Sequence, residues 1–161
     1  MGMRRLRCLD LAYNRMDAAQ QDAAALAQAL PLFASMLEEL QLRACGLGPE
    51  GMALLAPVLG QTTSLVWLAL RDNQLRSEGV GRFVPALKRM PTMSSLGLTR
   101  NLLSPGAYTP VAHALSGRDR LPTVSTIKHE CDRRRLREER GDLEVWLCSL
   151  SDFSGRRYGG R

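Results

Sequence analysis

Residues 65–73 read LVWLALRDN, and the spacing of their apolar residues returns three more times in the 161-residue chain. Each copy has an apolar residue at positions one, four and six and carries Asn or Cys at position nine. The copies occupy residues 6–14, 37–45, 65–73 and 93–101, so their starts are 31, 28 and 28 residues apart. A further step of 28 residues reaches 121–129, which keeps the spacing and loses most of the identities. A fixed period of this length is the sequence signature of a repeat architecture.

Each copy is followed by four apolar residues at offsets of 0, 3, 4 and 7, which define one face of a short helix. The four sets are Ala23, Leu26, Ala27 and Leu30; Met52, Leu55, Ala56 and Leu59; Val80, Phe83, Val84 and Leu87; and Tyr108, Val111, Ala112 and Leu115. Within each copy, positions four and six lie two residues apart and point to one face of a strand. Each unit is therefore predicted to be a strand and then a helix, and neighbouring units must stack to bury both faces.

Position nine predicts a ladder of buried side chains, made of Asn14, Cys45, Asn73 and Asn101. An Asn held inside a tight turn can hydrogen-bond backbone groups of its own unit and of the next one, which would otherwise be buried without partners. Cys45 is expected to replace the Asn once, as a small buried side chain.

The full pattern, Leu-x-x-Leu-x-Leu-x-x-Asn/Cys-x-Leu, closely resembles the leucine-rich repeat family, in its ribonuclease-inhibitor-like subclass with long, helix-containing repeats. The closing position is filled by Met16, Leu47, Leu75 and Leu103. The resemblance implies an α/β fold, a short curved solenoid of right-handed strand–helix coils with parallel strands on the concave face. Two features depart from the pattern: the long first spacing, and Pro57 and Pro85 late in their helices, which predict kinked or short helices.

Residues 1–130 are predicted to form the repeat domain, with four clear repeats and a degenerate fifth, and residues 131–161 differ from them. Charged pairs at i,i+4 favour a helix modestly in 132–144. An apolar stripe follows, at Leu143, Trp146, Leu147 and Leu150. One interpretation is a terminal helix that covers the end of the stack, and the other is a helix that binds a partner. Residues 154–161 are expected to form a flexible basic tail.

The stretch GLGPEG at 46–51 matches the dinucleotide-binding fingerprint, and Asp72 follows at about the distance of a ribose-binding acid. The repeat accounts for the whole match. The first two glycines align with Gln74 and Arg76 of the next unit as turn residues. The last glycine aligns with Gly79 at a helix start, where a compact residue lets units pack. We therefore predict no nucleotide and no other cofactor.

The net charge of +6 comes from the two ends of the chain, where six arginines have no acidic neighbours. The 16 basic residues between them balance the 16 acidic ones, so the body lacks the basic face that nucleic-acid binding usually needs. No apolar run approaches the roughly 20 residues that span a membrane.

Four cysteines, Cys8, Cys45, Cys131 and Cys148, have no paired spacing and predict free thiols in the cytoplasm or nucleus. His129 lies near two of them, but the spacing is not that of an ordinary zinc site, so no metal is expected.

Positions three, five and seven of each copy alternate with the buried leucines and are predicted to face the concave side. The predicted partner-binding residues are Trp67, Arg71, Arg43, Glu39 and Asp10, with Tyr13, Asp72 and Arg100 in an adjoining loop column. An exposed Trp67 suits an interface hot spot, whereas the alternative is that it folds against Val66 or a loop and binds nothing. The mixed signs of charge favour a protein partner over a polyanion.

These patterns favour a non-catalytic protein-interaction module, because the resemblance implies binding of another protein on the concave face and no catalytic motif occurs. One alternative is a regulator of a small GTPase, since Ran GTPase-activating proteins resemble this repeat type, although none of their catalytic residues is matched. Another is nucleic-acid contact through the arginine-rich ends. The first repeat lacks a polar cap, so we also expect self-association or adjoining repeats at that end.

Overall fold

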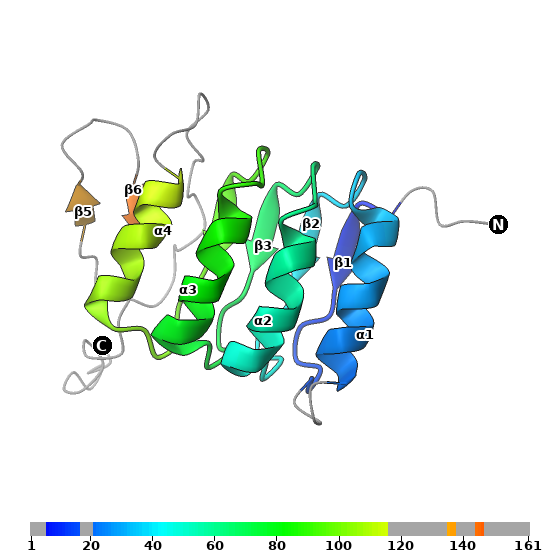
Figure 1. Ribbon diagram of the computed structural model, residues 1–161, viewed down its shortest axis with the longest axis horizontal. Helices are drawn as coiled ribbons and strands as arrows, with labels where there is room; N and C mark the ends of the chain where they lie inside the picture. Colours follow the sequence, from blue (N-terminus) through cyan, green and yellow to red (C-terminus); the bar gives the residue numbers. More distant parts are fainter. Residues whose placement is uncertain (1–5, 17–20, 116–134, 138–143, 147–161) are drawn as a thin grey trace, which may run out of the picture.

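The computed structural model describes residues 6–16 and 21–115, and the backbone of 135–137 and 144–146. Four strands form one parallel sheet in chain order: β1 (Cys8–Asp10), β2 (Glu39–Gln41), β3 (Trp67–Ala69) and β4 (Ser95–Gly97). Each strand is followed by a helix: α1 (Gln21–Ala29), α2 (Gly48–Leu59), α3 (Arg76–Leu87) and α4 (Tyr108–Leu115). Two short 3-10 helices, η1 (Leu30–Phe33) and η2 (Pro105–Ala107), adjoin α1 and α4. The helices lie side by side over one face of the sheet, which is an α/β repeat fold (Figure 1).

The sheet register places the same repeat position of every unit side by side. Cys8 pairs with Glu39, Glu39 with Trp67, and Trp67 with Ser95. All four are position three of their copies, so the alignment of the four sequence copies is confirmed in space.

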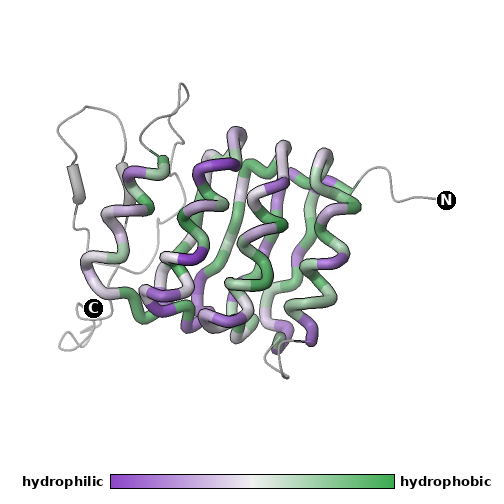
Figure 2. The backbone as a smooth tube through the Cα atoms, viewed as in Figure 1, coloured by the Kyte–Doolittle hydropathy of each residue, from purple (hydrophilic) through white to green (hydrophobic). Residues whose placement is uncertain are grey.

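The core lies between the sheet and the helices and is made of the repeated apolar residues. In the second and third units, all six residues at positions one, four and six are fully buried: Leu37, Leu40, Leu42, Leu65, Leu68 and Leu70. Their equivalents in the first unit, Leu6, Leu9 and Leu11, are only partly buried. Hydrophobic stretches of each helix alternate with hydrophilic ones along the turns, as a one-sided core requires (Figure 2). The inner units are therefore the best packed.

The turn after each strand uses left-handed backbone at fixed positions. Tyr13, Ala44, Asp72 and Arg100, which align in the repeat, have φ of 63°, 54°, 59° and 59°. Gly46, with φ of 68°, aligns with Gln74, which has φ of 53°. Gly48, with φ of 59°, aligns with Arg76, with φ of 54°, so the first two glycines of GLGPEG are turn residues as predicted. Gly51 is buried in the first turn of α2, at the predicted helix start.

Pro57 and Pro85 do not shorten their helices. Both α2 and α3 have 12 residues and continue for two residues beyond the proline. A proline acts on the turn before it, through the missing N–H and its contact with the carbonyl four residues earlier, and this ends neither helix. The prediction is wrong as regards short helices, and a kink at either proline stays a prediction.

Two glycines of α3 allow a matched test of the packing between units. A Cβ on Gly81 would meet nothing within 4 Å, whereas a Cβ on Gly79 would lie 3.1 Å from the Pro49 Cα of the preceding unit. Gly81→Ala is expected to raise the free energy of unfolding by about 0.5–1 kcal/mol, because alanine favours the helix. Gly79→Ala should gain less or lose stability, because crowding offsets the same preference. Urea unfolding of both variants checks this, and equal gains would show that Gly79 is not at a tight contact.

The C-terminal segment forms strands where a helix was predicted. β5 (Arg135–Arg137) and β6 (Glu144–Trp146) pair antiparallel, with Arg137 opposite Glu144 in the register. The helix prediction is wrong at these residues. Charged pairs at i,i+4 gain only about 0.2–0.5 kcal/mol each, and Gly141 in a helix interior costs about 1 kcal/mol. The fifth repeat, the rest of the predicted helix and the tail lie outside the described residues.

Candidate functional site

The turns that end the strands are joined by Asn73, which is fully buried. Its Oδ1 accepts hydrogen bonds from the backbone N–H groups of Cys45 at 3.0 Å and Leu47 at 3.4 Å. Its Nδ2 donates to the carbonyl oxygens of Leu42 at 2.6 Å and Leu70 at 2.9 Å. One side chain thus connects the turns of the second and third units.

Asn101 repeats this arrangement one unit further along. Its Oδ1 accepts from the N–H groups of Asn73 at 2.9 Å and Leu75 at 3.3 Å. Its Nδ2 donates to the carbonyls of Leu70 at 2.8 Å and Leu98 at 2.9 Å. The strand ends of the last three units are therefore held in register by side-chain amides.

The first unit has a weaker version of the ladder. Asn14 is exposed rather than buried, and its Nδ2 bonds carbonyls of its own unit only, Leu11 at 3.0 Å and Ala12 at 3.4 Å. The described residues include no unit before it. Cys45 is buried, and its Sγ donates to the Leu11 carbonyl at 3.1 Å. Burial raises the pKa of this thiol, which keeps the proton that the hydrogen bond needs.

We call the side of the sheet away from the helices the strand face. Trp67 lies on it between Glu39 and Ser95, and it is half-buried rather than exposed as predicted. The next positions on this face are small: Ala69 on β3 and, opposite it, Gly97 on β4. The helices lie on the opposite side of the sheet (Figure 1).

Three arginines converge on one carboxylate where the strands end, and we call this group the arginine cluster: Arg43, Arg71 and Arg100 around Asp72. The Asp72 Oδ2 lies 3.5 Å from the Nε of Arg43 and 3.2 Å from the Nε of Arg71. Its Oδ1 lies 3.2 Å from the Nε of Arg100. The left-handed turn at Asp72 places the carboxylate between arginines of the units on both sides.

Arg43 and Arg100 are the more exposed arginines of the cluster. The side chains of Arg43 and Arg100 are 37% and 48% exposed, whereas Asp72 is 23% exposed. The guanidinium carbon of Arg43 lies 5.3 Å from the centroid of the Tyr13 ring, which holds it by a cation–π contact. The Arg43 Nε is buried and has no hydrogen-bond acceptor among the described residues. The guanidinium groups of Arg43 and Arg100 are therefore partly open to solvent beside Asp72.

The other predicted residues are not part of this cluster. The Asp10 carboxylate accepts a hydrogen bond from the Ala12 N–H at 2.9 Å and so stabilises its own turn. Glu39 is exposed at the start of β2, at the end of the strands remote from Arg43. Sequence reasoning missed the ion pair of Arg7 with Glu38, whose Nη2 and Oε2 lie 2.6 Å apart. It also named the members of the arginine cluster without finding that they share Asp72.

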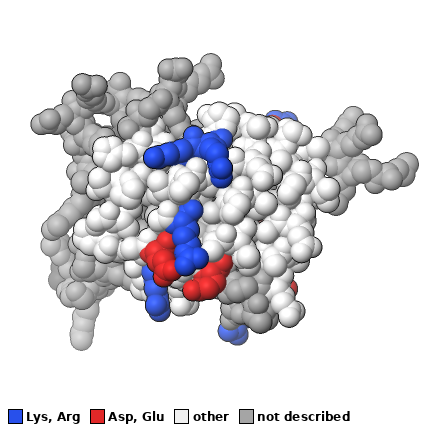
Figure 3. Space-filling model, viewed as in Figure 1, with Lys and Arg blue, Asp and Glu red and all other residues white. Residues whose placement is uncertain are grey.

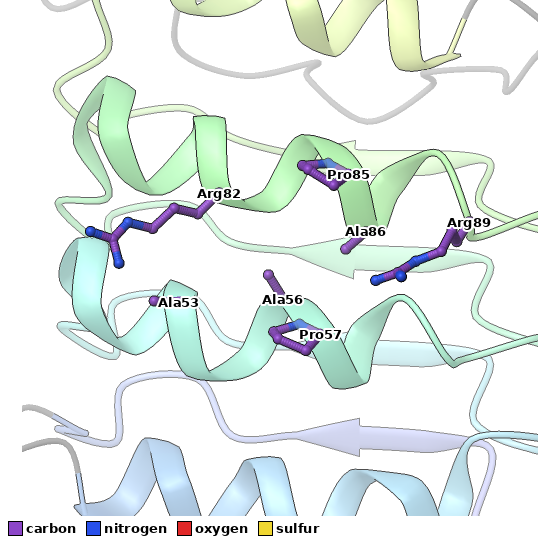
Figure 4. A pocket seen from close by; sticks show the side chains of 7 residues that line it. All are labelled: Ala53, Ala56, Pro57, Arg82, Pro85, Ala86 and Arg89. Atoms are coloured by element: carbon purple, nitrogen blue, oxygen red, sulfur yellow. The ribbon is translucent and has the colours of Figure 1, made fainter.

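The helix side carries a shallow hollow of about 340 Å³ between α2 and α3. It is lined by Ala53, Ala56, Pro57, Arg82, Pro85, Ala86 and Arg89. Arg82 extends from α3 and Arg89 from the segment that follows it, at opposite ends of the hollow (Figure 4). Arg82 forms an ion pair with Glu78 on the same helix at 2.5 Å. On this face, charged side chains gather over α2 and α3 and the rest is largely uncharged (Figure 3). The hollow brings together no catalytic set of side chains.

Metal-ligating side chains do not gather in the described ranges: no three His, Cys, Asp or Glu residues lie close enough to hold an ion. None of the described helices is both long and apolar enough to cross a bilayer. His129, Cys131 and Cys148 lie outside the described residues.

Comparison with known proteins supports the leucine-rich repeat family. The leucine-rich repeat family model matches residues 34–56. The chain is 36% identical over 84 residues to mouse NACHT, LRR and PYD domains-containing protein 5. That match covers 52% of this chain and 7% of the mouse protein, so the chain corresponds to a small part of this relative.

A solved structure, Leiomodin-1 Actin-Binding Site 2, has a similar fold with a TM-score of 0.56. The similarity covers 71% of this chain and 66% of that one at 14% sequence identity. At this identity the likeness concerns the fold alone.

Proposed function

We propose that the chain is a non-catalytic protein-interaction module and that a protein partner docks on the strand face across Trp67, Arg43 and Arg71. Leucine-rich repeat domains generally mediate contacts between proteins, and the name of the leiomodin site records that it binds actin. For this chain we propose a protein partner without taking over that identity.

The observation that carries the proposal is a large aromatic ring and an arginine cluster on one side of the sheet. Trp67 and Arg71 are four residues apart along β3 and its continuation, so both belong to the strand face. At about 3.3 Å per residue they are separated by roughly 13 Å, which one interface can cover. Trp and Arg are the residues most enriched among interface hot spots.

We further propose that the stacked units curve, with the strand face concave, and that the chain works in the cytoplasm or nucleus as a scaffold. Its repeats would be of the ribonuclease-inhibitor-like subclass. Glu39, Asp10 and Tyr13 would line the contact around the central residues, and Asp72 and Arg100 would complete its basic edge.

Photo-crosslinking can locate the partner. A benzoylphenylalanine placed at Gln41 or Ser95 on the strand face is expected to form an adduct with a partner protein in cell extract. The same group at Leu54 or Gly81, both exposed on helices, is the matched control and should not. In the Gln41 background, Trp67→Ala is expected to weaken binding by about 2 kcal/mol or more while the melting curve stays unchanged.

Adducts from the helix positions alone would place the partner on the opposite side of the molecule. Unchanged adduct yield in the Trp67→Ala/Arg71→Ala double variant would likewise remove the binding site from the strand face.

A further inference from the structure

We infer that Ser104 is a phosphorylation site for a proline-directed protein kinase, an enzyme that transfers phosphate from ATP to a serine or threonine followed by proline. Ser104 lies in the loop between β4 and α4, immediately before η2. The inference concerns covalent modification and does not depend on the proposed function.

The backbone conformation of Ser104 is the first argument. Serine or threonine precedes proline at two places in the 161-residue chain, Ser104-Pro105 and Thr109-Pro110. A proline favours extended backbone in the residue before it, and Ser104 has φ of −73° and ψ of 154°. Thr109 instead lies inside α4, where the backbone is helical. Protein kinases bind the residues around the acceptor hydroxyl as an extended strand, so of the two motifs Ser104 is the one in a suitable conformation.

Exposure of the loop is the second argument. Ser104, Pro105 and Gly106 are all exposed, and Leu102 is 47% exposed. A Cβ on Gly106 would have no described atom within 4 Å, so the space beside the loop is open on that side. Leu103 is the buried residue of this segment. A kinase can therefore reach the serine, the proline and the following residue while displacing one buried side chain.

The hydrogen bonds of Ser104 are the third argument. Its Oγ lies 2.8 Å from the Oγ of Ser77, in the first turn of α3, and its N–H donates to that same Oγ at 3.0 Å. Ser77 accepts this N–H and can donate its own hydroxyl proton to the Ser104 Oγ. In this arrangement the Ser104 hydroxyl proton is free to leave, while the backbone hydrogen bond holds the serine at the joint of the third and fourth units.

The reaction balances with ATP as the co-reactant. The Ser104 Oγ attacks the γ-phosphorus of ATP, its proton passes to the catalytic aspartate of the kinase, and the bond from the γ-phosphorus to the leaving oxygen of ADP breaks. The product is phosphoserine, which carries a charge of about −1.5 to −2 at neutral pH. Phosphorylation therefore places a strong negative charge at the joint of the third and fourth units, beside the start of α3.

The test incubates the full-length protein with ATP and each of two proline-directed kinases, one cyclin-dependent and one mitogen-activated. Mass spectrometry of the intact protein and of its peptides is expected to find phosphate on Ser104. Ser104→Ala should abolish this incorporation, whereas the matched control Thr109→Ala, at the other motif, should leave it unchanged. Pro105→Ala keeps the hydroxyl and should also prevent incorporation, because these kinases require the proline.

A synthetic peptide of residues 99–108, which lacks Thr109, is assayed beside the folded protein. Phosphate on the peptide but not on the protein would overturn the inference, since the fold would then hide Ser104. Absence of phosphate from both, or transfer to Thr109 in place of Ser104, would overturn it as well. Circular dichroism checks that the variants fold. Ser104→Thr retains a hydroxyl and should restore the incorporation that Ser104→Ala loses, and equal incorporation by Ser104→Ala and the parent would refute the site.

Discussion

Replacing Asn73 with alanine is expected to lower the free energy of unfolding by about 3 kcal/mol or more. Three buried backbone groups would lose their hydrogen bonds: the N–H of Cys45, the N–H of Leu47 and the carbonyl of Leu42. None of the three has another partner among the described residues, and each unsatisfied buried group costs about 1–3 kcal/mol. The Leu70 carbonyl would keep its bond from Asn101 and adds little.

Chemical unfolding by urea, followed by circular dichroism, measures this loss. Asn14→Ala is the matched control, because the same substitution at the same repeat position removes exposed bonds within one unit. It should cost less than about 1 kcal/mol. Similar losses at both positions would mean that the buried bonds between units contribute no more than exposed ones.

Phe83→Ala is expected to destabilise the protein by about 3–5 kcal/mol, through lost burial and the cavity left behind. Phe83 lies on the inner side of α3 and heads the fully buried side chains by volume. Its helix packs between α2 and α4, so a cavity there weakens contacts in both directions along the stack.

Arg82→Ala is the matched control. It introduces the same alanine into α3 at the exposed position next to Phe83. It removes an ion pair on the surface of α3 and should cost less than about 0.5 kcal/mol. Thermal and urea unfolding of both variants measure these losses. A free energy of unfolding for Phe83→Ala within about 1 kcal/mol of the parent would contradict the buried position of Phe83.

The repeat units could be predicted from the sequence because the same pattern occurs in four copies. The spacing of Leu65, Leu68 and Leu70 predicts one buried strand face, and the repeat alignment predicts the register with the neighbouring strands. The C-terminal segment has no second copy to check it. There, weak i,i+4 ion pairs predict a helix at residues where β5 and β6 form.

The site was harder to predict, because its geometry depends on backbone conformation that residue types do not specify. Asp72 has a non-glycine side chain at φ of 59°, and nothing in its identity indicates that this turn brings it to arginines of three units. The available signal was the column itself, since Arg43 and Arg71 align and Arg100 lies one position further. The burial of Trp67 was misjudged because strand alternation gives the side of the sheet but not the depth of packing.

The even register of the sheet also limits which backbone shapes could follow the arginine cluster across units. Neighbouring strands are about 4.8 Å apart, so the backbone positions that carry the arginines are spaced at roughly that interval. An extended chain advances about 3.3 Å per residue, so its side chains do not match the spacing of the strands. One turn of an α-helix advances 5.4 Å, so a helix laid across the strands would drift by only about 1 Å over two steps. A helix laid across the strands could therefore present side chains one turn apart to successive units of the sheet.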